Sequence, residues 1–237
     1  MKVAAVIPAH NEAARIAEVL RVVRSVPEID EILVVDDGST DGTAAVAAQF
    51  EGVEVVSLPT NVGKAGAMHA GVVRTDAEIL LFLDADLQGL TATHVQDLLA
   101  PVLRDEADMT VGVFRRGRRL TDWSQLIAPF ISGQRAMKRG LFEHIPKVYK
   151  LKSGIEVALT RHARLLGARV RRVPLWGGTH VMKEEKLGLW RGFKARLRMY
   201  GQILGYLGFR WPYDRLTVWW QRVRRRTAFR RENGRGS

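Results

Sequence analysis

Carboxylate side chains follow three separate apolar runs in the first 90 residues of this sequence. The runs 3–7, 31–35 and 79–83 are short and rich in branched residues, as expected of buried strands in a parallel sheet. The carboxyl ends of such strands lie at one edge of the sheet, where open α/β folds bind their ligands. We therefore expect the following carboxylates to gather at that edge: Glu12, Asp36, Asp37, Asp84 and Asp86.

The pair Asp84 and Asp86 is a candidate metal site. In an extended chain residues i and i+2 point the same way, so both carboxylates would project together from the end of the 79–83 strand. Neighbouring carboxylates repel unless a cation lies between them, and a hard divalent cation prefers oxygen ligands. An isolated Asp-x-Asp is more typical of a solvated acidic turn. The metal interpretation therefore depends on the other acidic strand ends.

Residues 1–115 alternate between predicted strands and predicted helices. Two further strands are predicted at 53–58 and 108–114. Helices are predicted near 12–23, 43–50, 61–74 and 91–104. This alternation favours an α/β fold with a mostly parallel central sheet and right-handed crossovers.

The regular alternation stops after residue 115. The pattern predicts a helix near 122–141, a helix at 153–166, a strand at 169–174, a polar loop at 177–186 and two amphipathic helices within 187–231. Residues 232–237 form a short tail rich in Gly and Arg.

The composition excludes several classes of protein. With 46% hydrophobic and 26% charged residues the chain can bury an ordinary core. The absence of cysteine excludes disulfides and cysteine-ligated metals. The amino terminus is typical of a first strand rather than a signal peptide, and no run of about 18 apolar residues predicts a transmembrane helix.

The net charge of +12 belongs to one segment. Residues 187–231 contain twelve Lys or Arg and one acidic residue, Asp214, whereas the rest of the chain is nearly neutral. The excess charge is therefore a property of the predicted amphipathic helices and not of the predicted sheet.

Four motifs in residues 1–115, about half of the chain, resemble the family 2 glycosyltransferases with the GT-A fold. In order they are Val6-Ile7-Pro8-Ala9-His10-Asn11-Glu12, Val34-Val35-Asp36-Asp37-Gly38-Ser39-Thr40-Asp41-Gly42-Thr43, Asn61-x-Gly63-Lys64-Ala65-Gly66 and Leu83-Asp84-Ala85-Asp86. The resemblance implies transfer of a sugar from a UDP- or GDP-sugar, with Mg²⁺ or Mn²⁺ on the diphosphate. It also implies a catalytic domain at 1–186, with a nucleotide-binding half at 1–115 and an acceptor half at 116–186.

The resemblance also implies roles for individual residues. Asp37 would hydrogen-bond the base, Lys64 would lie near the base or phosphates, and Asp84 would face the ribose or the sugar. Asp86 would ligate the metal, whose charge stabilises the departing nucleoside diphosphate. Three further residues would line the nucleotide pocket: Pro8, Ala9 and Glu12.

Within the family, Asp84-Ala85-Asp86-Leu87-Gln88 is similar to the polyprenyl-phosphate sugar transferases. That similarity makes Gln88 either a metal ligand or a plain turn residue. Arg115, Ser132 and Arg135 match the acceptor-phosphate positions of that group only loosely. The guanidinium fork suits phosphate, and we favour a functional role for Arg135 more than for Arg115; the alternative for both is a solvated surface arginine.

Two residues of the second half have open interpretations. His180 resembles the third metal ligand of the glucosyl-3-phosphoglycerate synthases, although a lone histidine is usually structural. Glu156 begins a predicted helix, where the helix dipole favours a carboxylate, or it is the acceptor-side base. A phosphate acceptor is already ionised and needs no base. The residues that we predict to be catalytic are Asp86, Glu156 and Arg135.

The segment 187–231 has three interpretations. Its aromatic stripes would pack on the body, lie in a membrane interface with arginines flanking, or accompany nucleic-acid binding. We favour a cytoplasmic protein held peripherally at the inner face of an anionic membrane, because a lipid-phosphate acceptor explains such a segment. No nucleic acid is expected. A small soluble acceptor such as phosphoglycerate, a basic nucleic-acid-binding protein and an inactive scaffold are the alternatives, and the oligomeric state stays open.

Overall fold

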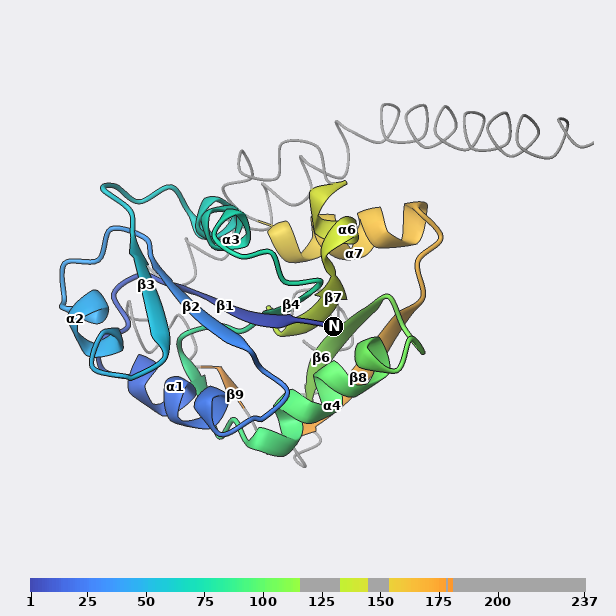
Figure 1. Ribbon diagram of the computed structural model, residues 1–237, viewed down its shortest axis with the longest axis horizontal. Helices are drawn as coiled ribbons and strands as arrows, with labels where there is room; N and C mark the ends of the chain where they lie inside the picture. Colours follow the sequence, from blue (N-terminus) through green and yellow to red (C-terminus); the bar gives the residue numbers. More distant parts are fainter. Residues whose placement is uncertain (116–132, 145–153, 178, 181–237) are drawn as a thin grey trace, which may run out of the picture. The chain divides into compact units, whose positions relative to one another are not determined.

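The computed structural model describes residues 1–115, 133–144, 154–177 and 179–180 (Figure 1). By its internal contacts the chain divides into two compact units, Met1–Phe193 and Lys194–Ser237. The second unit lies wholly outside the described residues. The predicted domain boundary at residue 186 and the predicted amphipathic helices therefore stay predictions.

The described residues form a seven-stranded sheet with the order β3-β2-β1-β4-β7-β6-β8. All neighbouring pairs are parallel except those made by β7, which runs antiparallel to both β4 and β6. The mostly parallel α/β sheet predicted from the sequence is thus confirmed. The strands are β1 Val3–Ala9, β2 Glu31–Asp36, β3 Val53–Ser57, β4 Ile79–Phe82, β6 Met109–Arg115, β7 Arg135–Lys138 and β8 Val170–Trp176.

Helices cover both faces of this sheet (Figure 1). One buried cluster joins β1 to α1 and α4, with Val19 and Leu98 among its members, and the other joins β1 to α3 and α7, with Met68 and Leu159. Alternate residues of β1 enter opposite clusters, as the period of two in a strand requires. The helices are α1 Ile16–Arg24, α2 Thr43–Ala47, α3 Lys64–Val73, α4 Ala92–Leu103, α6 Arg139–Glu143 and α7 Ile155–Leu165.

Helix α3 packs closely on the sheet through Gly71. A Cβ at this glycine would lie 2.5 Å from Cγ1 of Val6 in β1 and 3.0 Å from Cγ2 of Val35 in β2. The missing side chain therefore fixes the depth at which α3 lies on the strands, and so the place of its first residue, Lys64.

The prediction of a helix near 122–141 was wrong in its last part. Residues 135–138 form β7, and a separate short helix, α6, begins at Arg139. Because β7 is only four residues long and is hydrogen-bonded on both sides, pairing within the sheet and not local periodicity sets its conformation. The part at 116–132 lies outside the described residues.

The predicted loop 177–186 contains a short strand. β9, Thr179–His180, pairs antiparallel with β5, Leu87–Gln88, to form a separate two-stranded sheet. Within the described part of the chain, no helix is both long and apolar enough to cross a membrane.

Candidate functional site

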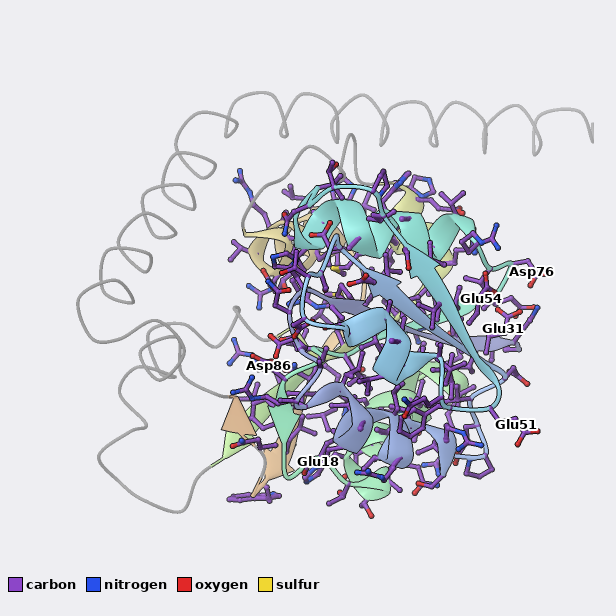
Figure 2. All side chains as sticks on the ribbon, turned by 90° about the vertical axis from the view of Figure 1, so that its left-hand side faces the viewer. Glu18, Glu31, Glu51, Glu54, Asp76 and Asp86 are labelled. Atoms are coloured by element: carbon purple, nitrogen blue, oxygen red, sulfur yellow. The ribbon has the colours of Figure 1, made fainter. Side chains whose placement is uncertain are left out.

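The predicted metal carboxylates lie at the carboxyl end of the parallel strands. Figure 2 shows Asp86 across the sheet from Glu31, the first residue of β2. The strand β4 ends at Phe82, earlier than predicted, and Asp86 lies in a turn. The residues on either side of each acid all enter one core cluster, so the two carboxylates still face away from it; the cluster residues are Leu83, Ala85 and Leu87.

The loops that follow β1 and β2 are bonded to each other. Asn11, which adopts a left-handed conformation with φ 56°, accepts from the backbone N–H of Thr40 at 2.9 Å. The N–H of Glu12 donates to Oγ1 of Thr43 at 2.9 Å. These bonds fix the position of Glu12, whose half-buried carboxylate lies 3.4 Å from Nη1 of Arg15. The sequence analysis placed Glu12 after the first strand, and the place in the nucleotide pocket that the resemblance implies for it stays a prediction.

Asp37 positions the loop that leads into α3. Its side chain is only 3% exposed, and its two carboxylate oxygens accept from the N–H groups of Val62 at 2.7 Å and Gly63 at 2.9 Å. The same loop, between β3 and α3, also approaches Gly38, where an added Cβ would lie 2.9 Å from the backbone nitrogen of Asn61. Asp37 therefore has a clear structural task, and its predicted contact with a base stays a prediction.

Lys64 links two carboxylates from separate elements. As the first residue of α3 it places Nζ 2.5 Å from Oδ1 of Asp84 and 2.7 Å from Oε1 of Glu156, in the first turn of α7. The side chains are 31%, 19% and 14% exposed, respectively. Burial alone would lower the pKa of Lys64, but the two carboxylates outweigh it and raise the pKa. The ammonium therefore stays charged at neutral pH.

The start of β7 completes this cluster. Nε2 of Gln134 donates to Oδ2 of Asp84 at 3.0 Å. Arg135 is fully buried and donates from Nη1 to the backbone carbonyl of Glu156 at 3.1 Å. Burial lowers the pKa of Arg135 to about 10, against the opposing effect of the carboxylates of Glu156 and Asp84. Arg135 is therefore not the solvated surface arginine that the sequence left open.

Gly133 makes room for the ion pair. A Cβ built on it would meet the carboxylate of Asp84 and would lie 2.6 Å from Nζ of Lys64. We name Lys64, Asp84, Gln134, Arg135 and Glu156 the charged cluster. Sequence reasoning missed Gly133 and Gln134, although both stand inside the Ser-Gly-Gln-Arg motif that singled out Ser132 and Arg135.

The structure brings together the backbones of the segments that carry the predicted metal ligands. In the β5–β9 pairing Leu87 lies opposite His180, so the chain at His180 runs beside the segment that follows Asp86. Asp86 is half-buried and Gln88 is exposed. No cluster of three or more His, Asp or Glu side chains suited to a metal occurs among the described residues, which exclude the side chain of His180. An Asp, an amide and an imidazole nonetheless form a donor set that suits a divalent cation.

The remaining predicted site residues are placed only by their positions on strands, or lie outside the described residues. Pro8 and Ala9 are the last two residues of β1, at the same edge of the sheet as Asp84. Arg115 ends β6 opposite Trp176 of β8. The side chain of Arg115 and all of Ser132 lie outside the described residues.

Comparison with known proteins identifies the family. Residues 4–155 match the sequence model of glycosyl transferase family 2. The chain belongs to this family. Two curated relatives transfer sugars to polyprenyl phosphates by name. One is the dodecaprenyl-phosphate galacturonate synthase of Rhizobium johnstonii, with 26% identity over 74% of this chain and 54% of the relative. The other is the undecaprenyl-phosphate 4-deoxy-4-formamido-L-arabinose transferase of Proteus mirabilis, with 34% identity over 50% of this chain and 38% of the relative.

The family 2 chain thus spans about half or less of the length of these curated relatives. Among solved structures it is similar to the glucosyl-3-phosphoglycerate synthase of Mycobacterium tuberculosis. The complex of that enzyme with Mn²⁺, UDP and glucosyl-3-phosphoglycerate has a TM-score of 0.62 and 28% identity, over 76% of this chain and 72% of the other. Another complex of the same enzyme holds Mn²⁺, UDP-glucose and phosphoglyceric acid, again with a TM-score of 0.62. The fold expected from the sequence motifs, GT-A, is confirmed.

Proposed function

We propose that this protein is a metal-dependent glycosyltransferase that moves a sugar from a UDP- or GDP-sugar to a phosphorylated acceptor. One observation carries the proposal: the turn Asp84-Ala85-Asp86 lies at the carboxyl end of the sheet, within the span that matches the family. Supporting it, the structurally similar synthase binds UDP-glucose together with Mn²⁺.

The donor would be held by groups at the ends of β1 and β2 and at the start of α3. Pro8, Ala9 and Glu12 would line the nucleotide pocket, and Asp37 would contact the base from beside the loop that it already fixes. Among its contacts, Oδ1 of Asp84 lies 2.5 Å from Nζ of Lys64, and Oδ2 accepts from Nε2 of Gln134 at 3.0 Å. These contacts would hold the carboxylate of Asp84 toward a ribose or sugar hydroxyl of the donor.

A divalent cation would be held by Asp86, with Gln88 and His180 as further ligands. When bound, such a cation supplies charge stabilisation to the departing nucleoside diphosphate, worth several kcal/mol. The protein's own contribution is the fixed turn: Leu83, Ala85 and Leu87 are all buried in one core cluster, which holds the carboxylates at the edge of the sheet.

The acceptor we favour is a polyprenyl or other lipid phosphate. The curated relatives act on polyprenyl phosphates, and the basic segment 187–231 suits an anionic membrane surface. Arg115 and Ser132 are the proposed contacts to the acceptor phosphate. A small soluble phosphorylated acceptor is the second candidate. It is favoured by the likeness to the glucosyl-3-phosphoglycerate synthase and by the pairing of His180 with Leu87, directly after Asp86.

The test is a transfer assay with a panel of UDP- and GDP-sugars, with and without Mn²⁺, offered a polyprenyl phosphate in one arm and 3-phosphoglycerate in the other. We expect transfer to one acceptor that stops when Mn²⁺ is chelated. Asp86→Ala should lower the rate by about 100-fold or more, in line with several kcal/mol of lost stabilisation. Asp97→Ala, on the exposed face of α4, is the matched control and should leave the rate unchanged. Absence of transfer, or full transfer by Asp86→Ala, would contradict the proposal.

A further inference from the structure

The carboxylate of Glu156 faces the charged cluster. Its Oε1 lies 2.7 Å from Nζ of Lys64, and the same ammonium lies 2.5 Å from Oδ1 of Asp84. Glu156 is 14% exposed and Asp84 is 19% exposed, so both carboxylates have lost most of their contact with solvent. The ammonium of Lys64 is therefore held between an acid at the donor edge of the sheet and an acid on α7.

We infer that Glu156 is a positioning residue, which acts through Lys64 to hold the carboxylate of Asp84, and that it is not the base of the reaction. The inference rests on the proposed function. It assigns Glu156 to donor binding, although the residue lies in the acceptor half of the chain.

Charge balance favours this assignment. Two carboxylates on one ammonium leave a net negative charge. The buried guanidinium of Arg135 donates to the backbone carbonyl of Glu156, and its positive charge offsets this negative charge at close range. If Glu156 lost its charge, only Asp84 would attract the ammonium of Lys64. The ion pair would then no longer be fixed relative to α7. Oε1 of Glu156 already accepts from the ammonium of Lys64 at 2.7 Å, so the geometry engages this carboxylate in holding the ammonium.

The arrangement joins four elements of the fold. Lys64 begins α3, and Asp84 follows β4. Arg135 begins β7, Gln134 directly precedes it, and Glu156 lies in the first turn of α7. The backbone at Gly133 also approaches the pair closely, since a Cβ added there would lie 2.6 Å from Nζ of Lys64. The position of Asp84 is thus set jointly by donor-side and acceptor-side elements.

The test uses the full chain and the nucleotide sugar that it transfers. Glu156→Gln, Lys64→Met and the double variant are compared with the wild type, with Glu51→Gln at an exposed turn as the matched control. For each protein, KM for the nucleotide sugar, kcat and the pH profile of kcat are measured. Gly133→Ala is a further variant that keeps every charge and crowds the same ion pair, so it carries the test if a charge variant fails to fold.

We expect Glu156→Gln, Lys64→Met and Gly133→Ala each to raise KM for the nucleotide sugar about 10-fold, within the range of coupling between contacting residues. The double variant should be no worse than Lys64→Met alone, and the acidic limb of the pH profile should persist in Glu156→Gln. A drop in kcat of about 100-fold or more, with KM unchanged and the acidic limb lost, would identify a base and overturn the inference. Unchanged kinetics in Glu156→Gln would overturn it as well. If the wild type transfers no sugar at all, the proposed function falls first.

Discussion

Asp108, just before β6, accepts several hydrogen bonds outside the site. Its Oδ2 accepts from the backbone N–H of Arg169 at 2.9 Å, and its Oδ1 lies 2.9 Å from Nζ of Lys138. The hydrogen bonds from Arg169 are the main cause that holds the pKa of Asp108 well below its usual range, against a smaller opposing effect of burial. Asp108 therefore stays ionised in the folded protein to lower pH than in the unfolded chain.

The sign of the pH dependence follows from this depressed pKa. Above about pH 4, the unfolded-state value, the stabilisation by Asp108 is fully present, and it is lost as the pH falls from there toward the folded-state pKa. Asp108→Asn should cost about 1.5–3 kcal/mol at pH 7, as for a lost hydrogen bond to a charged group, and less at pH 2. Urea unfolding at several pH values measures this difference, with Asp97→Asn as the control. A difference that does not change with pH would count against it.

At this scale the sequence singled out residues of the site, but not the contacts between them. Asp37 and Asp84 were singled out as acids at strand ends, Lys64 by the family resemblance, and Glu156 as a carboxylate at the start of a predicted helix. The bonds of Asp37 to the backbone at 62–63 and of Lys64 to Glu156 join residues 25 to 92 positions apart in the chain. Such partners are set by the packing of α3 and α7, which one sequence does not show.

At the scale of elements, two helical glycines provide a matched pair. Gly71 in α3 faces the strands, and an added Cβ would lie 2.5 Å from Cγ1 of Val6, a fully buried and stiff side chain. Gly140 in α6 has no atom within 4 Å of an added Cβ. The two positions share a residue type and a helical conformation and differ in the space around them.

Replacement of each glycine by alanine should therefore change stability in opposite directions. Gly140→Ala should stabilise the protein by about 0.5–1 kcal/mol, because alanine loses less backbone entropy in a helix. Gly71→Ala should destabilise it by roughly 1–3 kcal/mol, since overpacking of the α3 interface outweighs the same helical gain. Equilibrium unfolding in urea measures both changes, and a stabilising Gly71→Ala would show that α3 can lift from the sheet at little cost.

The elements themselves were predictable where they are long and periodic. The amphipathic pattern of α1 and the apolar run of β4 are clear in the sequence. The helices α4 and α7 and the strand β8 lie within a residue or two of their predicted bounds. The strand β7 was not predicted, because its four residues, Arg-Ala-Met-Lys, carry no alternation that distinguishes a strand from a helix. It is a strand because β4 and β6 offer hydrogen-bonding partners on both sides.

At the scale of the whole molecule, charge separates the catalytic body from the segment 187–231. Eleven of the twelve net positive charges fall in that segment, which also carries aromatic residues at helical spacing, while the rest of the chain is nearly balanced in charge. A body that needed the charge for its own stability would not confine it in this way. The segment therefore points to an anionic partner, and we propose a membrane surface as that partner.

Peripheral attachment of this kind should be electrostatic and reversible. The full chain should sediment with vesicles that contain phosphatidylserine at physiological salt, should not sediment with neutral vesicles, and should be released at about 1 M salt, where the Debye length is about 3 Å. Each arginine near an anionic leaflet contributes about 1 kcal/mol, so replacement of the three arginines at 224–226 by glutamine should weaken binding by roughly 100-fold. The matched control replaces Arg21, Arg24 and Arg104, three exposed arginines of the body, and should weaken binding far less.

If both triple variants lose affinity equally, net charge and not the segment drives binding. If the wild type ignores anionic vesicles and binds DNA or RNA with a steep salt dependence, the basic segment serves nucleic acid instead. A lipid-phosphate acceptor would then lose its main support outside the site, and the soluble phosphorylated acceptor would become the better candidate.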